Sequence, residues 1–355
     1  MANKKKSLSE EVSKEIKSKF DLNGFKDKKG LSGNVKYKLQ QWIPFSEPLQ
    51  EILEIPGVAM GHINLLRGHS NTGKTTALIE VAMAAQKMGI LPVLIITEMK
   101  HSWEHWKSMG FEYEEVVDKK TGEIIDFEGN FLYKDRETLN SIESVAEFIA
   151  DLMDEQKKGN LPYDLLFLWD SIGSIPCQMS LDQNKNNPMW NAGAMSQQFA
   201  NFINQKIVLS RKESFKYTNT MVAVNKTWVA PALTPMAQPK LKNKNGDAMF
   251  YDASLVFTFG GIINAGTSKI KAQNNKKEFE FGLRTRVNCD KNHVTGVTAK
   301  GQIISTAHGF IKNTPTEIKK YKDKYKDEWS NLLGEGNYDI IEEEIDVIDG
   351  LDETE

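Results

Sequence analysis

The chain of 355 residues has few cysteines and no long apolar run. Its two cysteines, Cys177 and Cys289, lie far apart without the spacing of a metal-binding pair, which argues against a disulfide scaffold and a zinc site and suits a reducing cytoplasm. No run approaches the roughly 18 apolar residues of a membrane-spanning helix. Residues 1–6 are basic, but no apolar core follows them, so we expect no secretory signal and no membrane partner.

The net charge of −3 conceals an acidic end. Residues 339–355 contain nine acidic residues and no lysine or arginine, so the rest of the chain carries +6. Such a tail could screen a polyanion-binding site, or it could only aid solubility, and composition leaves both open. We expect the tail to be disordered.

The strongest motif is Gly-His-Ser-Asn-Thr-Gly-Lys-Thr, which begins at Gly68 and matches the phosphate-binding (Walker A) pattern. An apolar run precedes it and a helix-competent run follows, which makes a chance match in a surface turn the poorer interpretation. Glycines let backbone N–H groups face phosphate oxygens, Lys74 supplies a catalytic cation, and the Thr75 hydroxyl can ligate Mg²⁺. The predicted nucleotide-binding residues are therefore Gly68, His69, Ser70, Asn71, Thr72, Gly73, Lys74, Thr75 and Thr76.

Two further apolar runs, 93–97 and 165–169, read as buried strands that end at Glu98 and Asp170. Ligands of open α/β sheets collect at the carboxyl ends of strands. Glu98 is therefore a candidate to orient or deprotonate the attacking water, although it could equally be a carboxylate near a helix N-terminus. Asp170 fits the Walker B position, in which a carboxylate holds Mg²⁺ opposite Thr75.

The remaining patterns set the organisation of the chain. The pattern of residues 8–20 predicts a helix with one apolar stripe, and a linker follows this helix. Residues 1–44 are therefore expected to form an arm, which could fold back on its own core or dock on a neighbouring subunit. Residues 112–136 predict an inserted hairpin. Ile142 to Met153 predict an amphipathic helix, and residues 313–338 a short helical segment.

In this order the motifs resemble those of RecA recombinases, most closely the phage recombinases of the UvsX type, over residues 45–312. Besides Glu98 and Asp170, the resemblance rests on these stretches: Phe45 to Ile63; Ser108-Met109-Gly110; Asp170-Ser171; Met195-Ser196-Gln197; Gly246 to Ser254; and Thr285-Arg286-Val287 with Lys291-Asn292.

The resemblance implies an α/β RecA-like P-loop ATPase core with a central, mostly parallel, twisted sheet flanked by helices. It also implies a DNA-dependent ATPase that uses ATP and Mg²⁺, forms filaments on single-stranded DNA, and promotes homologous pairing and strand exchange. The expected partners are single-stranded DNA, homologous duplex DNA and further copies of the chain, with single-stranded-DNA-binding and mediator proteins as candidates. A phage protein of this kind would act in the host cytoplasm.

The resemblance also assigns two segments, 176–194 and 228–247, as irregular loops that bind DNA. The second contains the predicted DNA-binding residues Trp228, Lys240, Lys242 and Lys244. Lysines that reach phosphates and apolar side chains that stack on bases suit single-stranded DNA. Without the resemblance, two solvated surface loops would be the better interpretation.

The chain departs from the family pattern at three places. Lys226 stands where the family usually has a glutamine that senses the γ-phosphate. A cation there could make the same contact more strongly, as a catalytic residue, or it could abolish the switching linked to hydrolysis. His105 and Trp106 stand where the family stacks a tyrosine on adenine, and either ring could do so. Lys291 matches the first of two paired lysines that in the family reach the neighbouring subunit's ATP. His293 stands where the second lysine would be.

Two other functions fit the same motifs. A ring-forming DNA helicase shares the core but would need a collar domain, for which residues 1–44 are too short. A DNA-coating protein that binds nucleotide with little hydrolysis would account for Lys226 and His293.

Overall fold

The computed structural model describes residues 36–99, 101–230, 240–261 and 267–344. The chain forms two units, residues 1–39 with 212–214 and residues 40–211 with 215–355. In the first unit, Tyr37 forms an antiparallel bridge to Lys212. The predicted helix at 8–20 lies outside the described residues, and so do 231–239 and 345–355.

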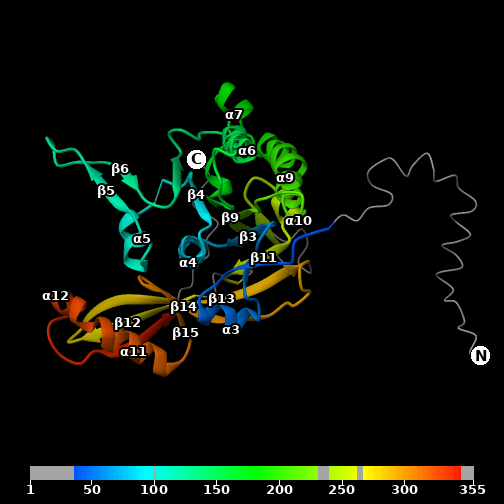
Figure 1. The fold of residues 1–355 in the computed structure, drawn as a ribbon. Coiled ribbons are helices and arrows are strands. Elements are labelled where there is room, and N and C mark those ends of the chain that lie inside the picture. The colour runs from blue at the N-terminus through cyan, green and yellow to red at the C-terminus, as the bar shows by residue number, and fades with distance from the viewer. Residues whose placement is uncertain (1–35, 100, 231–239, 262–266, 345–355) are drawn as a thin grey trace, which may run out of the picture. The chain divides into compact units, whose positions relative to one another are not determined.

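A large mixed sheet organises the second unit (Figure 1). Its centre is parallel, and the strands read as continuous apolar runs because both faces are covered. In spatial order the parallel strands of the described chain are β11 (Leu255–Phe259), β3 (Ile63–Gly68), β9 (Asn219–Ala230), β8 (Leu165–Asp170), β4 (Leu91–Ile96) and β7 (Leu132–Asp135).

Antiparallel strands extend this sheet beyond β11. They are β13 (Lys277–Asn292), β14 (Lys300–Thr306), β15 (Gly309–Lys312), β12 (Ser268–Asn274) and β16 (Asp339–Glu344). The predicted α/β fold with a mostly parallel central sheet flanked by helices is confirmed at this level.

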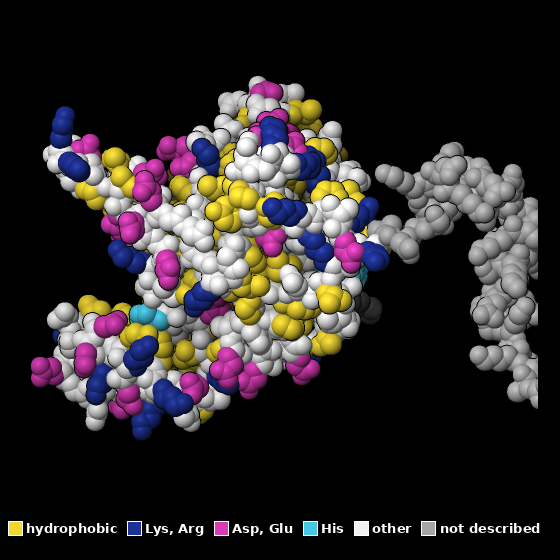
Figure 2. All heavy atoms as spheres, viewed as in Figure 1, with side chains coloured by type: hydrophobic (Ala, Val, Ile, Leu, Met, Phe, Trp, Pro, Cys, Tyr) yellow, Lys and Arg dark blue, Asp and Glu magenta, His cyan; other side chains and the backbone are white. Residues whose placement is uncertain are grey.

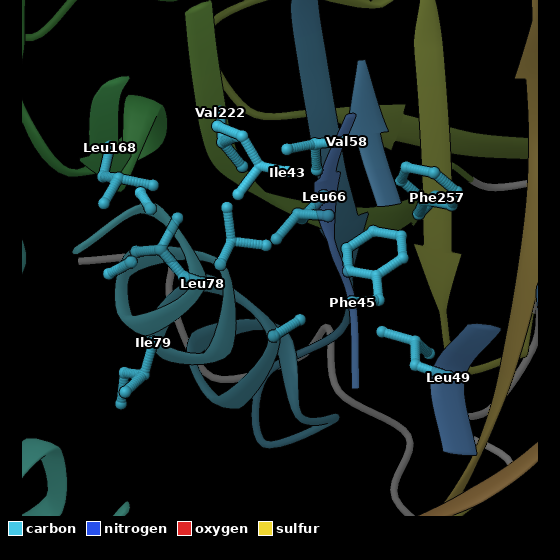
Figure 3. Packing of buried hydrophobic residues seen from close by; sticks show 14 of the residues in the cluster. Ile43, Phe45, Leu49, Val58, Leu66, Leu78, Ile79, Leu168, Val222 and Phe257 are labelled. Carbon is cyan, nitrogen blue, oxygen red and sulfur yellow. The ribbon is translucent and has the colours of Figure 1, made fainter. Parts of the chain in front are cut away.

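Alternate residues of the central strands enter two cores. On β3, Leu66 packs with α3 (Glu47–Leu53) and α4 (Lys74–Lys87), whereas Leu65 packs on the opposite face with α6 (Ile142–Lys158) and the helix Ser196–Ile203 that runs into α9 (Asn204–Leu209). Figure 3 shows the first core around Phe45, Leu66 and Leu78. Each fully buried side chain of this size contributes roughly 1.5–3 kcal/mol to stability. A short antiparallel pair, β1 (Trp42–Pro44) with β2 (Gly57–Ala59), covers the same core.

Two predictions that rest on short stretches of sequence agree with the structure. Helix α6 begins at a capping box on Ser141 and ends at Gly159, which confirms the predicted amphipathic helix. The predicted hairpin is also confirmed: β5 (Glu114–Val117) pairs with β6 (Ile124–Glu128), and the hairpin projects from the sheet (Figure 1). Charges of both signs are interspersed over the face in Figure 2.

The C-terminal segment covers the antiparallel extension. Helices α11 (Pro315–Tyr325) and α12 (Ser330–Leu333) pack on β12 and β13 through Phe281, Tyr321 and Trp329. The prediction of a disordered acidic tail is wrong for residues 339–344, which form β16 on the edge of β12. Opposite charge explains the strand, because Glu342 pairs with Arg284 and Glu343 with Lys271.

Candidate functional site

Two glycines, Gly68 and Gly73, determine the shape of the loop between β3 and α4. A Cβ on Gly68 would lie 2.0 Å from the Phe259 carbonyl oxygen on the neighbouring strand, so a side chain at this position would clash. Gly73 has a φ of 91°, which favours glycine, and it is the residue before α4. The loop therefore curls over the first turn of a 14-residue helix, whose free N–H groups suit an anion.

Lys74 lies in the first turn of α4 and is 6% exposed. Its ammonium donates to the His69 carbonyl oxygen and to the Thr72 hydroxyl at 3.3 Å. These two contacts hold the ammonium over the loop. The side chain thus places a buried cation where the sequence predicts phosphates.

Thr75, in the first turn of α4, meets Asp170 at the end of β8. The Thr75 hydroxyl donates to Asp170 Oδ2 at 3.0 Å, while the buried Oδ1 of Asp170 has no hydrogen-bond partner in the described chain. Burial, with a smaller contribution from the Glu98 charge, raises the pKa of Asp170 to about 6.

A cation would relieve this buried carboxylate, and a hydroxyl beside a carboxylate is the oxygen set that Mg²⁺ takes when phosphates and waters complete its shell. The described residues contain no group of three or more His, Cys, Asp or Glu side chains that could hold a metal by themselves. Thr75 and Asp170 therefore fit Mg²⁺ bound together with phosphates, and do not fit a metal site made of protein alone.

Glu98 and Lys226 form an ion pair, with Lys226 Nζ 2.9 Å from Glu98 Oε1. Glu98 follows the end of β4, and Lys226 lies on β9 in register with Gly68 on β3. Both side chains are partly accessible. The predicted catalytic carboxylate therefore already has a cationic partner, which a glutamine at position 226 would not supply.

These groups line one cavity of about 210 Å³. Of the predicted site residues it brings together Ser70, Asn71, Thr72, Gly73, Lys74, Thr75, Glu98, Asp170 and Lys226. Thr76 turns away from it and bonds Ser305 at 2.8 Å, and His69 is 2% exposed.

His101, which no sequence pattern singled out, also lines this cavity. Its ring stacks near Tyr133 and meets Trp103 edge-on, with centroids 4.9 Å apart in the second case. Burial and the nearby His105 lower the pKa of His101 to about 4, so the ring is neutral at pH 7.

The two candidate adenine-stacking rings have different surroundings. Trp106 is 1% exposed and packs edge-on against Phe111 in the core, so it has no face open to a ligand. The prediction is therefore wrong for Trp106, because this side of α5 (Trp103–Met109) faces inward. His105 is half-buried on the same helix and keeps accessible surface.

Lys291 lies away from its own loop. It pairs in register with Val256, which pairs with Leu65, three residues before Gly68 on β3. Three residues of a strand span roughly 10 Å, so Lys291 lies about that far from Gly68 along the strand direction. The Lys291 ammonium donates instead to the carbonyl oxygens of Phe250 and Tyr251.

The segment 228–247 is not irregular throughout, which corrects the prediction. Strand β9 continues to Ala230, and β10 (Lys240–Asn243) pairs with it as an antiparallel hairpin. Trp228 is 46% exposed and lies opposite the exposed Lys242, so the side chains lie together. Lys240 lies opposite Ala230, and Lys244 follows the strand.

The segment 176–194 is also more regular than predicted. It forms α7 (Gln178–Asp182) and α8 (Pro188–Met195), because Asn187 caps α8 and a buried Asn191 links the two helices. Met179 and Met189 remain exposed, at 51% and 82%.

Comparison with protein-family models and with curated protein sequences finds no match. Among the described residues, no helix combines the length and the apolar character required to cross a membrane.

Proposed function

We propose that this protein is an ATP-dependent DNA recombinase with a RecA-like core, which forms filaments on single-stranded DNA and promotes homologous pairing and strand exchange. One observation supports the ATPase part most directly. Lys74, Thr75, Glu98, Asp170 and Lys226 come from four neighbouring parallel strands and their connections, and they line a single cavity at the carboxyl ends of these strands.

Each side chain then has a defined task in hydrolysis. The loop N–H groups and Lys74 hold the β and γ phosphates, and Thr75 and Asp170 hold Mg²⁺. Bound there, Mg²⁺ supplies charge neutralisation at the phosphate oxygens. Glu98 accepts the proton of the water that bonds to the γ-phosphorus as the bond to ADP breaks. Lys226 faces the phosphate that separates.

The recombinase part rests on the ordered sequence resemblance and on the hairpin. Trp228 and Lys242 present an aromatic ring beside a cation on an exposed face, which is the combination that binds single strands by stacking and phosphate contact. Lys291 lies roughly 10 Å along the strand direction from its own loop, as expected for a residue that serves a neighbouring subunit's ATP.

The first test is Lys74→Ala, assayed for ATP hydrolysis and for nucleotide-dependent assembly on single-stranded DNA. We expect both to be lost. Lys87→Ala is the matched control, because Lys87 is an exposed lysine at the other end of the same helix. Unchanged turnover in Lys74→Ala would refute the assignment.

The Glu98–Lys226 ion pair favours a second candidate, a DNA-coating protein that binds nucleotide with little hydrolysis, because a carboxylate already paired with Lys226 is not free to bind the attacking water. Steady-state phosphate release with and without single-stranded DNA separates the two. Electron microscopy with DNA and Mg-ATP separates both from a ring helicase, since it shows either helical filaments or closed rings.

A further inference from the structure

The turn after β10 lies against the strand end that carries Asp170. Asn245 has a φ of 58°, and its side-chain amide donates to the carbonyl oxygens of Ile172 and Ile175, each at 3.0 Å. These carbonyls belong to the short turn that directly follows Asp170 and Ser171. One half-buried side chain therefore joins the end of the hairpin to the end of β8.

Asn245 also contacts the first predicted DNA segment, residues 176–194. Asn191 of α8 is 3% exposed and donates to Asn245 Oδ1 at 3.4 Å. Its own oxygen accepts from the Cys177 backbone N–H at 2.9 Å and from the Ser180 hydroxyl at 3.1 Å. Asn191 thus holds α7 and α8 together and links both to the turn.

The hairpin end is tied to the catalytic strand as well. The Lys244 N–H donates to the Lys226 carbonyl oxygen at 3.0 Å, and the Asn225 amide donates to the Lys244 carbonyl oxygen at 3.1 Å. The methylene chain of Lys244 also packs on Gly173. A Cβ added to Gly173 would lie 2.7 to 2.9 Å from the side-chain carbons of Lys244.

A second cavity, of about 460 Å³, lies where these groups meet. Its lining includes Asn191, Asn245, Lys244 and the Glu98–Lys226 pair, and that pair also lines the candidate nucleotide cavity. The two predicted DNA segments and the candidate catalytic pair therefore border one space.

We propose that Asn245, supported by Asn191, is a positioning residue that transmits the binding of single-stranded nucleic acid to the hydrolytic site. The inference rests on the proposed function. A displacement of either segment must carry the Ile172–Ile175 turn with it, because separation would leave amide and carbonyl groups without partners at a cost comparable to a lost hydrogen bond. The Ile172–Ile175 turn follows Asp170 and Ser171 in the chain, and the Lys244 N–H is hydrogen-bonded to the carbonyl oxygen of Lys226.

The test compares ATP hydrolysis with and without an oligonucleotide in Asn245→Gly. Glycine accepts the positive φ, so this variant removes the amide without straining the backbone. We expect the stimulation by DNA to fall by at least about fivefold, the lower end of usual coupling between sites. Binding of labelled DNA and of a nucleotide analogue should persist, which a general loss of structure would not allow.

Asn275→Gly is the matched control, because Asn275 also has a positive φ, of 48°, but is exposed in the turn between β12 and β13, outside both predicted DNA segments. It should keep full stimulation. Asn191→Ala should lower stimulation too, and combining it with Asn245→Gly should add little, because both break one connection. Full stimulation in Asn245→Gly, or an equal loss in Asn275→Gly, would overturn the proposal.

A second measurement needs no variant. Hydrogen exchange at residues 172–175 of the unaltered protein should change when the oligonucleotide binds, and unchanged exchange there would also overturn the proposal. If the unaltered protein binds DNA and hydrolyses ATP but Asn245→Gly responds normally, only this inference fails. If the unaltered protein neither hydrolyses ATP nor responds to DNA, the proposed function fails and this inference falls with it.

Discussion

Lys226 determines the electrostatics beside the candidate hydrolytic carboxylate. Its ammonium lies 2.9 Å from Glu98, and its strand is in register with the first glycine of the loop. A bound γ-phosphate would compete for this cation, since it carries more negative charge than a carboxylate. Binding of ATP would then release Glu98 to act on water while Lys226 turns to the phosphate.

This exchange predicts the behaviour of Lys226→Gln, which keeps a hydrogen-bond donor and removes the charge. We expect turnover to fall by roughly tenfold or more, because stabilisation of the transition-state charge is lost, with a smaller change in KM. Steady-state phosphate release measures both, and Lys119→Gln at the tip of the exposed hairpin is the control. A rise in turnover would instead support the candidate with little hydrolysis, in which Lys226 restrains Glu98.

His62 predicts how stability depends on pH. It is 8% exposed between Ser254 and Gln40, and burial, with the nearby Arg211 charge, lowers its pKa to about 4. The unfolded chain then binds more protons between about pH 4 and 6.5, so stability rises with pH across this window and is lost as the pH falls through it. The effect is at most about 3 kcal/mol.

The measurement is the melting temperature of the unaltered protein and of His62→Gln from pH 4.5 to 7. The variant should show a shallower slope, with the remainder due to groups such as His101, whose pKa is lowered in the same direction. Equal slopes would contradict the assignment to His62.

At the scale of elements, β16 closes an open sheet edge. It pairs with β12 over six residues, and its carboxylates lie against Lys271 and Arg284. Removing residues 339–355 should expose the β12 edge, lower the melting temperature by roughly 2–4 °C for each kcal/mol of pairing lost, and promote association. Removing only 345–355 discards acidic residues but keeps β16, so it should change neither. Equal effects of the two truncations would mean that charge, and not strand pairing, is responsible.

The contrast between elements shows what a sequence can predict. The strands that end near Glu98 and Asp170, the hairpin at 112–136 and helix α6 follow from apolar period and turn residues, which are local signals. Strand β16 was missed because its partners Lys271 and Arg284 lie about 60 to 70 residues earlier in the chain. Strand β10 was missed because its polar sequence forms a strand only beside the extended end of β9.

The candidate site divides in the same way. A motif of fixed spacing locates the loop residues, because their chemistry requires that order. Trp106 could not be distinguished from His105, because which side of α5 faces the core depends on the aromatic residues it packs against, among them Phe111, Phe127 and Tyr133. The burial of Trp106 is a tertiary property and has no local signature.

At the scale of the whole molecule, the position of Lys291 distinguishes a site within one subunit from a site shared by two. Its register with Val256 and Leu65 places it toward the start of β3, whereas the loop that would hold phosphates follows the end of that strand. A lysine side chain cannot cover this distance within the chain and also keep its bonds to the Phe250 and Tyr251 carbonyls. If Lys291 acts on ATP, it acts on the ATP of a neighbouring copy.

Mixing two inactive variants tests this arrangement. Glu98→Gln removes the base but keeps the loop and Lys291, while Lys291→Ala keeps the loop and the base. Each alone should be nearly inactive with single-stranded DNA. In an equal mixture, random head-to-tail assembly gives about a quarter of the sites an intact Glu98 and an intact neighbouring Lys291, so about a quarter of normal turnover should return. A mixture as inactive as its components would mean that adjoining subunits do not complete each other's sites, because recovery requires the two intact groups to come from different copies.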